Sequence, residues 1–385
     1  MISSISFYHK SLLVALIGIA FCAGCAATGD ITPLAKAANI GKYRIAVFPI
    51  ENLSGSKAPL KELRQTFTER VKAAGFDLLP DASLNLFLAR HRIRYVGGID
   101  TDSAQALAAE ERVDAVLITS LEYYNDRYPP KIALTARLVS TGKEPEILWM
   151  DSVGMAGDDS PGVFQIGIIN NPKELTYKAL SRLGESLFRG FSADFRDNAA
   201  DIAEKTFPPR ILYLTDLAPD KQFRIVVLPF YNLSGRKYAG EIMALRFIQE
   251  LRKLRNFHVV EPGVVRNGLL QFRLIMEGGV SFANADVVFD VLGANLVLTG
   301  KTINYWDEQG EAGAPNVVFS ATILDKKNRL VVLASDSYNA GDDRVMFFDF
   351  GKIRTALGVS SEMVRGIAER IVSPFRTPTS ESEGK

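Results

Sequence analysis

The hydrophobic positions of this chain follow one order twice. A short apolar run, at 45–50 and again at 225–230, is bounded by turn residues and predicts a strand buried on both faces. Apolar residues then recur at three- and four-residue steps, which predicts an amphipathic helix. These helical positions are Leu60, Leu63, Phe67 and Val71 in the first case and Ile242, Leu245, Ile248 and Leu251 in the second.

The same further elements follow in both places. A second short strand leads to a helix that we expect Asp81 to cap in the first case and Pro262 to begin in the second. A third helix, a long strand, a hairpin and a terminal helix complete each set. In the first hairpin, apolar residues alternate with Thr135 and Arg137, which predicts one buried and one exposed face. The predicted ranges are 76–79, 102–112, 131–139, 146–153 and 173–190, then 257–260, 284–292, 316–324, 330–338 and 352–372.

The residues themselves also repeat. The segment "RIAVFPIENLSG" at 44–55 returns as "RIVVLPFYNLSG" at 224–235, and we align Arg44 with Arg224 and Thr119 with Thr299 at a spacing of 180. Later matches have slightly larger spacings. They are Gly97-Gly98 with Gly278-Gly279 at 181, Ala136 with Ala321 and Asp151-Ser152 with Asp336-Ser337 at 185, and "AGDD" at 156–159 with 340–343 at 184. A period of this length indicates two whole domains, because solenoid repeats are much shorter.

We therefore expect an α/β fold: two tandem copies of a sandwich, each with a mixed β-sheet flanked by helices. The first copy is residues 43–192 and the second copy is residues 223–376. A connector at 193–222, in which "DNAADIAEKTF" is compatible with one more helix, joins them. The remaining ranges are a signal peptide at 1–24, a lipidated tether at 25–42 and a polar tail at 377–385.

The N-terminus has the pattern of an export signal. The roughly fourteen residues between Lys10 and Cys25 are mostly apolar and fall short of the ~20 that a spanning helix needs. The ending "CAGC" resembles the lipobox of bacterial lipoproteins, although Cys22 stands where Leu, Val or Ile is usual. The resemblance implies cleavage before Cys25, acylation of that cysteine with chains such as palmitate, and, since Ala26 follows, the outer membrane. The alternative is an ordinary secretory signal with a coincidental cysteine.

Cysteine count and charge narrow the function classes. The chain's two cysteines, Cys22 and Cys25, both lie at the signal boundary, so the folded body has no disulfide, cysteine nucleophile or cysteine metal site. Lys and Arg number 45 against 44 Asp and Glu, and the signal removes one Lys. The resulting net charge is close to zero, so the sequence predicts no strong electrostatic attraction to nucleic acid.

The order of motifs "RIAVFPIENLSG", a helix, "FDLLP" and then "VDAVLITSLEYY" resembles that of a superfamily of envelope domains. Its members include the amino-terminal domain of TolB, the curli secretion lipoprotein CsgG, and lipoproteins that activate peptidoglycan synthases or assist exopolysaccharide export. The resemblance covers roughly 43–155 and 223–340. It implies an anticodon-binding-domain-like fold without RNA binding.

Candidate catalytic residues are few, and the sequence predicts no cofactor or metal. His91 and His258 occupy unmatched positions in the two copies, and His9 lies in the signal. The "GDD" motifs at 157–159 and 341–343 are candidates for acid chemistry or a divalent ion, but we favour a turn that caps the following helix. "NLSG" at 52–55 and 232–235 is compatible with anion binding, but we favour a simple strand exit.

Two groups of residues are candidates for an interaction surface. Arg90, Arg92 and Arg94 form a local basic cluster, for which the alternative is a solvated face. Aromatic residues at equivalent strand ends can contact a partner, or pack the hairpin against its sheet. They are Tyr123, Tyr124, Tyr305 and Trp306.

The sequence thus favours a non-enzymatic, lipid-anchored adaptor that faces the periplasm and assists envelope assembly or export proteins. The alternative is a subunit of an oligomeric CsgG-like secretion channel, which needs additional membrane strands, whereas the connections at 124–131 and 304–316 are short and polar. A third hypothesis, an enzyme acting on cell-wall glycan, needs a pair of acids at a defined separation. The partner and the oligomeric state stay open.

Overall fold

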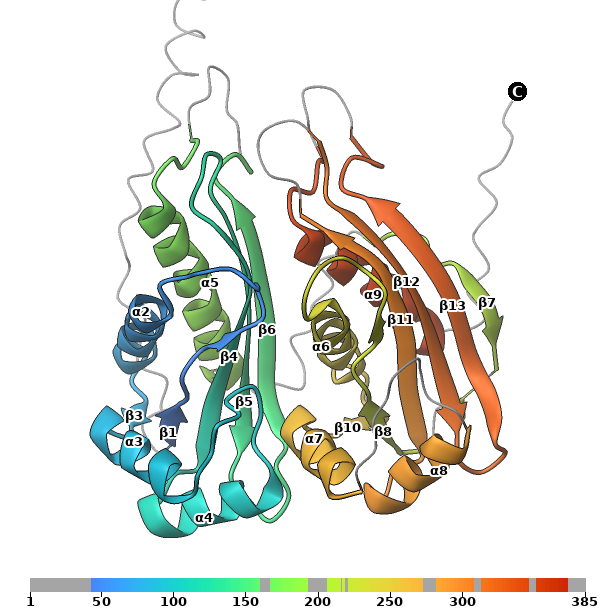
Figure 1. The fold of residues 1–385 in the computed structure, drawn as a ribbon, viewed down its shortest axis with the longest axis horizontal. Helices are drawn as coiled ribbons and strands as arrows, with labels where there is room; N and C mark the ends of the chain where they lie inside the picture. Colours follow the sequence, from blue (N-terminus) through green and yellow to red (C-terminus); the bar gives the residue numbers. More distant parts are fainter. Residues whose placement is uncertain are drawn as a thin grey trace, which may run out of the picture. The chain divides into compact units, whose positions relative to one another are not determined.

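The first copy is one mixed sheet with helices on both faces (Figure 1). The computed structural model describes residues 43–159, 167–192, 206–215, 217–218, 221–272, 282–307, 313–345 and 351–372, so Cys25, the tether and the tail lie outside it. In the first copy the strands run in the order β3-β1-β4-β5-β6, with β2 paired to β4. The elements are β1 (Arg44–Val47), β2 (Glu51–Asn52), α2 (Leu60–Ala73), β3 (Asp77–Leu78), α3 (Asp81–Arg90), α4 (Thr101–Glu111), β4 (Ala115–Asn125), β5 (Lys131–Ser140), β6 (Ile147–Ala156) and α5 (Pro172–Ser192).

The second copy repeats this topology with one addition. Its order is β10-β8-β11-β12-β13-β7, with β9 paired to β11. The elements are β7 (Ile211–Leu214), β8 (Phe223–Val227), β9 (Tyr231–Asn232), α6 (Ala239–Leu251), β10 (Phe257–Val259), α7 (Pro262–Gln271), α8 (Phe282–Val291), β11 (Leu296–Trp306), β12 (Asn316–Asp325), β13 (Leu330–Ala340) and α9 (Ala356–Val372). In both copies the first three paired strands are parallel and the hairpin is antiparallel, which confirms the predicted fold class.

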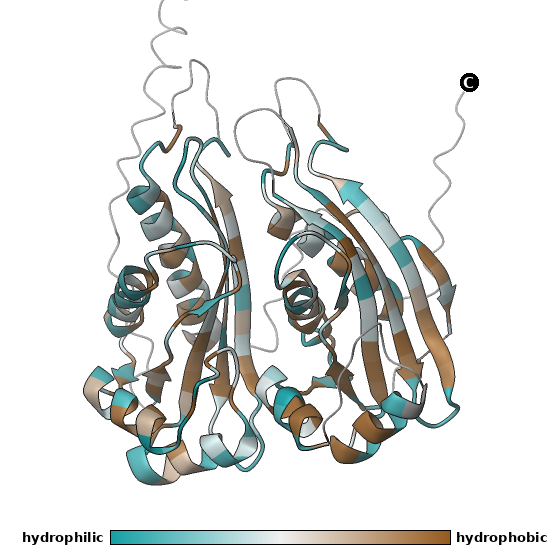
Figure 2. Cartoon of the chain, viewed as in Figure 1, coloured by the Kyte–Doolittle hydropathy of each residue, from teal (hydrophilic) through white to brown (hydrophobic). Residues whose placement is uncertain are grey.

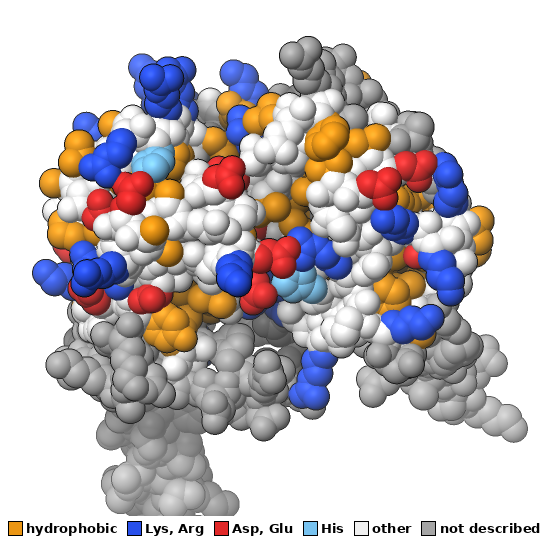
Figure 3. Space-filling view, turned by 90° about the horizontal axis from the view of Figure 1, so that it is seen from below, with side chains coloured by type: hydrophobic (Ala, Val, Ile, Leu, Met, Phe, Trp, Pro, Cys, Tyr) orange, Lys and Arg blue, Asp and Glu red, His pale blue; other side chains and the backbone are white. Residues whose placement is uncertain are grey.

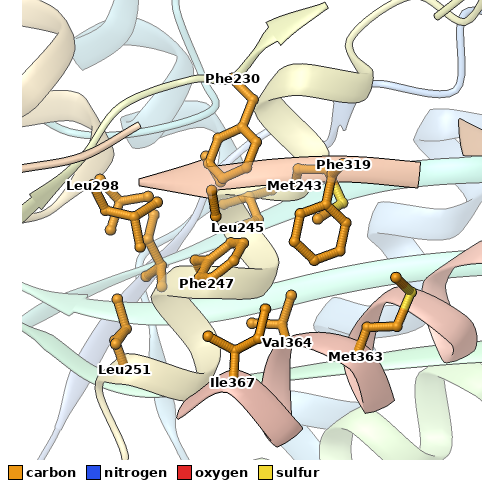
Figure 4. Close-up of a cluster of buried hydrophobic side chains, with 14 of the residues drawn as sticks. Phe230, Met243, Leu245, Phe247, Leu251, Leu298, Phe319, Met363, Val364 and Ile367 are labelled. Carbon is orange, nitrogen blue, oxygen red and sulfur yellow. The ribbon is translucent and has the colours of Figure 1, made fainter. Parts of the chain in front are cut away.

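The helices pack on the sheets through their apolar stripes (Figure 2). In the first copy, Phe87 of α3 and Leu107 of α4 share a buried cluster with Val116 and Ile118 of β4. In the second copy, Phe247 of α6 packs on Phe319 of β12 at 5.7 Å between ring centroids, close to Met363 and Ile367 of α9 (Figure 4). On the other face of the second sheet, Phe289 of α8 packs with Val297 of β11, so helices lie against both faces of this sheet.

Strand pairing corrects the predicted repeat register by one residue. Ile45 pairs with Ala115 and Ile225 with Leu296, a spacing of 181 between the partners, so Thr119 corresponds to Gly300 and not to Thr299. Similarly, Ala136 pairs with Asp151 and Ala321 with Ser335, which makes that spacing 184. Uninterrupted apolar runs align almost equally well when shifted by one position, so the sequence did not fix the register.

Helix α6 is buried on every side, unlike its counterpart α2. Every residue from Ala239 to Leu251 is buried except Glu241. Met243, Phe247 and Leu251 join the core of the second copy, and the same cluster contains Leu53 and Met150 of the first copy. Arg246 and Gln249 bond to the first copy directly. Helix α6 thus joins the two copies, and we call this contact region the seam.

The seam explains a prediction that was wrong. Thr135 and Arg137, expected on an exposed face of the first hairpin, are each only 1% exposed, because the second copy covers that face. In the second copy no such cover lies over the equivalent face within the described residues: β12 alternates between buried and half-buried positions, and the second half of β13 between buried and exposed ones.

Two smaller expectations also differ from the structure. Asp81 is the first residue of α3 and does not cap it; the N-cap is Pro80, and the Asp81 carboxylate accepts hydrogen bonds from Arg64. Within the connector, "ILYL" forms strand β7, which extends the second sheet beside β13. The helix expected at 197–207 falls mostly outside the described residues.

Candidate interaction site

The "NLSG" segments are turns that each use their own side chains. The Ser54 N–H donates to Asn52 Oδ1 at 3.1 Å, and the Ser234 N–H donates to Asn232 Oδ1 at 3.0 Å. The asparagine amides donate onward to the carbonyls of Ser56 and Arg236. The same bonds in both copies support a strand exit, since these side chains already satisfy the local backbone.

The "GDD" carboxylates are likewise committed to structure. Asp159 Oδ2 accepts from the Ala156 N–H at 2.8 Å, and Asp343 Oδ2 accepts from the Ala340 N–H at 2.9 Å. Asp158 forms an ion pair with Arg354 across the seam at 2.7 Å. The predicted turn is present, but Asp159 does not cap the next described helix, because α5 begins only at Pro172.

Two buried ion pairs hold the seam together. Arg137 donates to Glu261 Oε1 from Nε at 3.2 Å and from Nη2 at 2.9 Å, and neither side chain is more than 1% exposed. Burial raises the pKa of Glu261, and Arg137 opposes that rise. Arg246 pairs with Glu122 at 2.8 Å, equally buried. Charges that are removed from water in this way are stable only while paired, which makes each pair depend on both copies.

The predicted aromatic residues do not form one surface. Tyr123 and Tyr305 both face the Arg236 guanidinium, at 5.5 and 4.7 Å from the ring centroids. Tyr305 is 1% exposed, because it is part of the buried cluster that contains Val317 and Met363, and burial raises its pKa. It is therefore not available to a partner. Tyr124 lines a separate hollow beside α2, and Trp306 is exposed.

Backbone contact brings the first copy's glycine pair against helix α7. A Cβ on Gly98 would lie 2.6 Å from the Gly263 nitrogen, and a Cβ on Gly263 would collide with Ile99. Glu261 also caps α7, since its Oε2 accepts from the N–H groups of Gly263 and Val264. Glycine is required at Gly98 and Gly263 because the two copies meet backbone to backbone there.

The basic cluster lies beside this contact and is divided in two. Arg90 and His91 both bind Glu110, at 2.6 and 2.8 Å. Arg92 and Arg94 instead line a pocket of about 290 Å³ together with Arg266 of the second copy. We call this hollow the basic pocket. The remaining lining residues are His91, Ile93, Tyr95, Gly98, Ile99, Asp100, Ser103, Gly263 and Asn267.

A second hollow adjoins the basic pocket, and Tyr95 and Arg266 line both. Its volume is about 510 Å³, and its lining includes Leu53, Leu245, Ile248, Val265 and Leu269. We call it the apolar cavity. Glu51 also lines it; burial raises the pKa of this carboxyl, although Ser120 Oγ donates to it at 2.7 Å.

Charge is mixed over the end of the molecule seen in Figure 3, where acidic and basic side chains lie among hydrophobic ones. The excess of arginine in the basic pocket is therefore local. Among the described residues, no cluster of three His, Cys, Asp or Glu side chains is placed to hold a metal ion. None of the described helices has the length and apolar character needed to cross a membrane.

Solved structures with similarity to this chain include bacterial envelope lipoproteins. The PelC dodecamer from Paraburkholderia phytofirmans is 15% identical, over 43% of this chain and 96% of that chain, with a TM-score of 0.29. Lipoprotein GNA1162 from Neisseria meningitidis is 17% identical over 37% and 98%, with a TM-score of 0.28. The LpoB C-terminal domain from Escherichia coli is 14% identical over 32% and 87%, with a TM-score of 0.24. No family model and no curated protein matches. The resemblance to TolB and CsgG stays a prediction.

Sequence reasoning missed the second copy's contribution to this site. Arg266 and Glu261 lie more than 160 residues beyond Arg94 and Gly97 in the chain, and no local pattern connects them. One signal was present: "EIMALRFIQEL" at 241–251 is apolar around much of its circumference, which is typical of a helix covered on both sides.

Proposed function

We propose that this protein is a lipid-anchored, periplasm-facing adaptor, without catalysis of its own, that assists an envelope assembly or export system. The lipobox-like ending at Cys25 supports the anchor. The resemblance to envelope domains supports the setting. Both are sequence arguments. They concern the location of the chain and do not identify what it binds.

One structural observation supports the binding role: the two copies build a shared surface at the seam. Arg92 and Arg94 come from the first copy and Arg266 from the second, and the buried Arg137–Glu261 pair joins the copies next to them, since Glu261 caps the helix that carries Arg266. A surface fixed in this way is preorganised, so a partner loses less free energy in ordering it. The strongest candidates for acid chemistry, by contrast, are engaged in turns and in the Asp158–Arg354 pair.

The test is to express the chain with its signal intact in a Gram-negative host, crosslink mildly and identify the proteins that co-purify. A Cys25→Ser variant is the control for the anchor. We expect particular assembly or export components to be enriched with the wild-type chain and lost or mislocalised with the variant. Recovery of a membrane-embedded ring that contains only this chain would overturn the adaptor proposal in favour of the channel.

A further inference from the structure

We infer that the basic pocket and the apolar cavity together bind an acidic, hydrophobic segment of a partner protein, with a carboxylate in the first and an adjacent apolar side chain in the second. This inference rests on the proposed adaptor function and names the chemistry of the partner.

The basic pocket has an excess of cations over anions. Within the described residues, Arg92, Arg94 and Arg266 form no ion pair, whereas Arg90 next to them is paired with Glu110. Asp100 is the one acidic residue of the lining, and it already caps α4 by accepting from the Ser103 N–H at 3.0 Å and from Ser103 Oγ at 2.8 Å. Among the described residues, the lining thus sets three guanidinium groups against one carboxylate, which is already hydrogen-bonded to Ser103.

Guanidinium groups favour a carboxylate ligand. The planar fork of arginine matches the two oxygens of a carboxylate and can bind both at once. The Arg266 guanidinium stacks over the Tyr95 ring at 4.3 Å, which holds it in place. The pocket volume of about 290 Å³ lies at the lower end of ligand pockets, which are typically ~300–1,000 Å³. It suits side chains better than a cofactor.

The apolar cavity determines which kind of partner side chain fits next to the bound carboxylate. Tyr95 and Arg266 line both hollows, so a segment bound in one extends directly to the other. Leu53, Leu245 and Val265 line it beside the carboxyl groups of Glu51 and Glu241, so it offers apolar contact to an uncharged side chain and not to a second carboxylate. An anionic glycan fits less well, because Arg266 already covers one face of the Tyr95 ring and closes that face to a sugar.

The test uses the mature full-length chain purified in detergent and three probes. The first is a fluorescent peptide, Gly-Asp-Glu-Leu-Phe-Gly, the second is its Asn-Gln counterpart, and the third is an oligogalacturonate. Fluorescence polarisation measures the peptides and competition measures the glycan. We expect the acidic peptide to bind at least about tenfold more tightly than the neutral one, with the difference falling at high salt.

Variants assign the binding to the pocket. The triple change Arg92→Ser, Arg94→Ser and Arg266→Ser is expected to remove the tenfold preference. Arg90→Ser is the matched control, since Arg90 lies outside the pocket, and it is expected to leave the preference intact. Circular dichroism verifies that each variant is folded. Equal binding of the acidic and neutral peptides, an equal loss with Arg90→Ser, or a preference for the glycan would each overturn the inference.

The crosslinking experiment separates this inference from the adaptor proposal. If the triple variant still captures the wild-type partners, the adaptor stands and the pocket assignment is wrong. If the wild-type chain captures no partner, the adaptor proposal itself fails.

Discussion

Replacing Arg137 by methionine is the most direct test of the seam. The change removes both hydrogen bonds to Glu261 Oε1 and the one to the Gly97 carbonyl. Glu261 keeps its two donors from the start of α7 but loses its cation while fully buried. Methionine fills a similar space, so the main consequence is an unpaired charge.

The expected loss in the free energy of unfolding is about 3–5 kcal/mol, the usual effect of breaking a buried pair from one side. Arg329→Met is the matched control, because its pair with Asp286 is largely exposed, and it should cost no more than about 1 kcal/mol. The double variant Arg137→Met with Glu261→Gln should be more stable than Arg137→Met alone. The neutral amide can still accept the helix N–H groups.

Urea unfolding followed by circular dichroism and tryptophan fluorescence measures these differences, with Trp149 reporting on the first copy and Trp306 on the second. The pH dependence gives an independent check. Without Arg137 the pKa of Glu261, already raised by burial, rises further, so the loss should be smaller at about pH 5 than at about pH 8. A loss under about 1 kcal/mol, or a double variant as unstable as the single one, would refute the reasoning.

Three further predictions concern the same region. Gly98→Ala should destabilise the protein by about 1–3 kcal/mol in urea unfolding, because the new Cβ meets the Gly263 nitrogen. Gly142→Ala is the control and should leave the free energy of unfolding unchanged, because its Cβ would come no closer than 4.0 Å to a neighbouring atom. An equal loss in both variants would contradict the steric explanation. Burial raises the pKa of Glu51 above 4.5, so the folded state holds its proton to higher pH and stability falls as pH rises through that window. The melting temperature of Glu51→Gln should therefore be higher than that of wild type at neutral pH, and the difference should disappear toward pH ~4. A difference that is the same at every pH would contradict this explanation. Finally, residues 206–376 expressed alone, which keep β7 paired with β13, should self-associate in size-exclusion chromatography, because α6 loses its cover, whereas residues 43–192 alone should not.

The sequence was sufficient for the order of elements because each strand and helix has its own period. Strand β7 was missed, since four residues beside a connector carry too little pattern to distinguish a strand from a loop. The exposed face predicted for β5 was wrong for a different reason. Alternation along a strand separates two faces but does not say what covers each of them, and here α6 covers the polar one.

The candidate site was only half predictable. Arg92 and Arg94 were identified because they are close in sequence, and they do line the basic pocket. Arg266 was not, because its place beside them depends on packing between the copies. Tyr123 and Tyr305 were expected to meet a partner, and instead both contact Arg236 within the chain.

Because α6 is buried by both copies, the order of the two copies along the chain matters. Without the second copy, the face of the first sheet that carries Glu122, Thr135 and Arg137, now buried, would lie in water. Water solvates these polar groups well, so this half tolerates exposure while synthesis continues. Helix α6 is apolar on nearly every side, so water does not solvate it well, and it is fully buried only when the first copy is already present. Chains are made from the N-terminus, so the half that tolerates exposure is produced first. Reversing the order of the two copies in the gene would keep every internal contact within each sheet and yet expose the apolar helix first, at the stage when nothing could cover it.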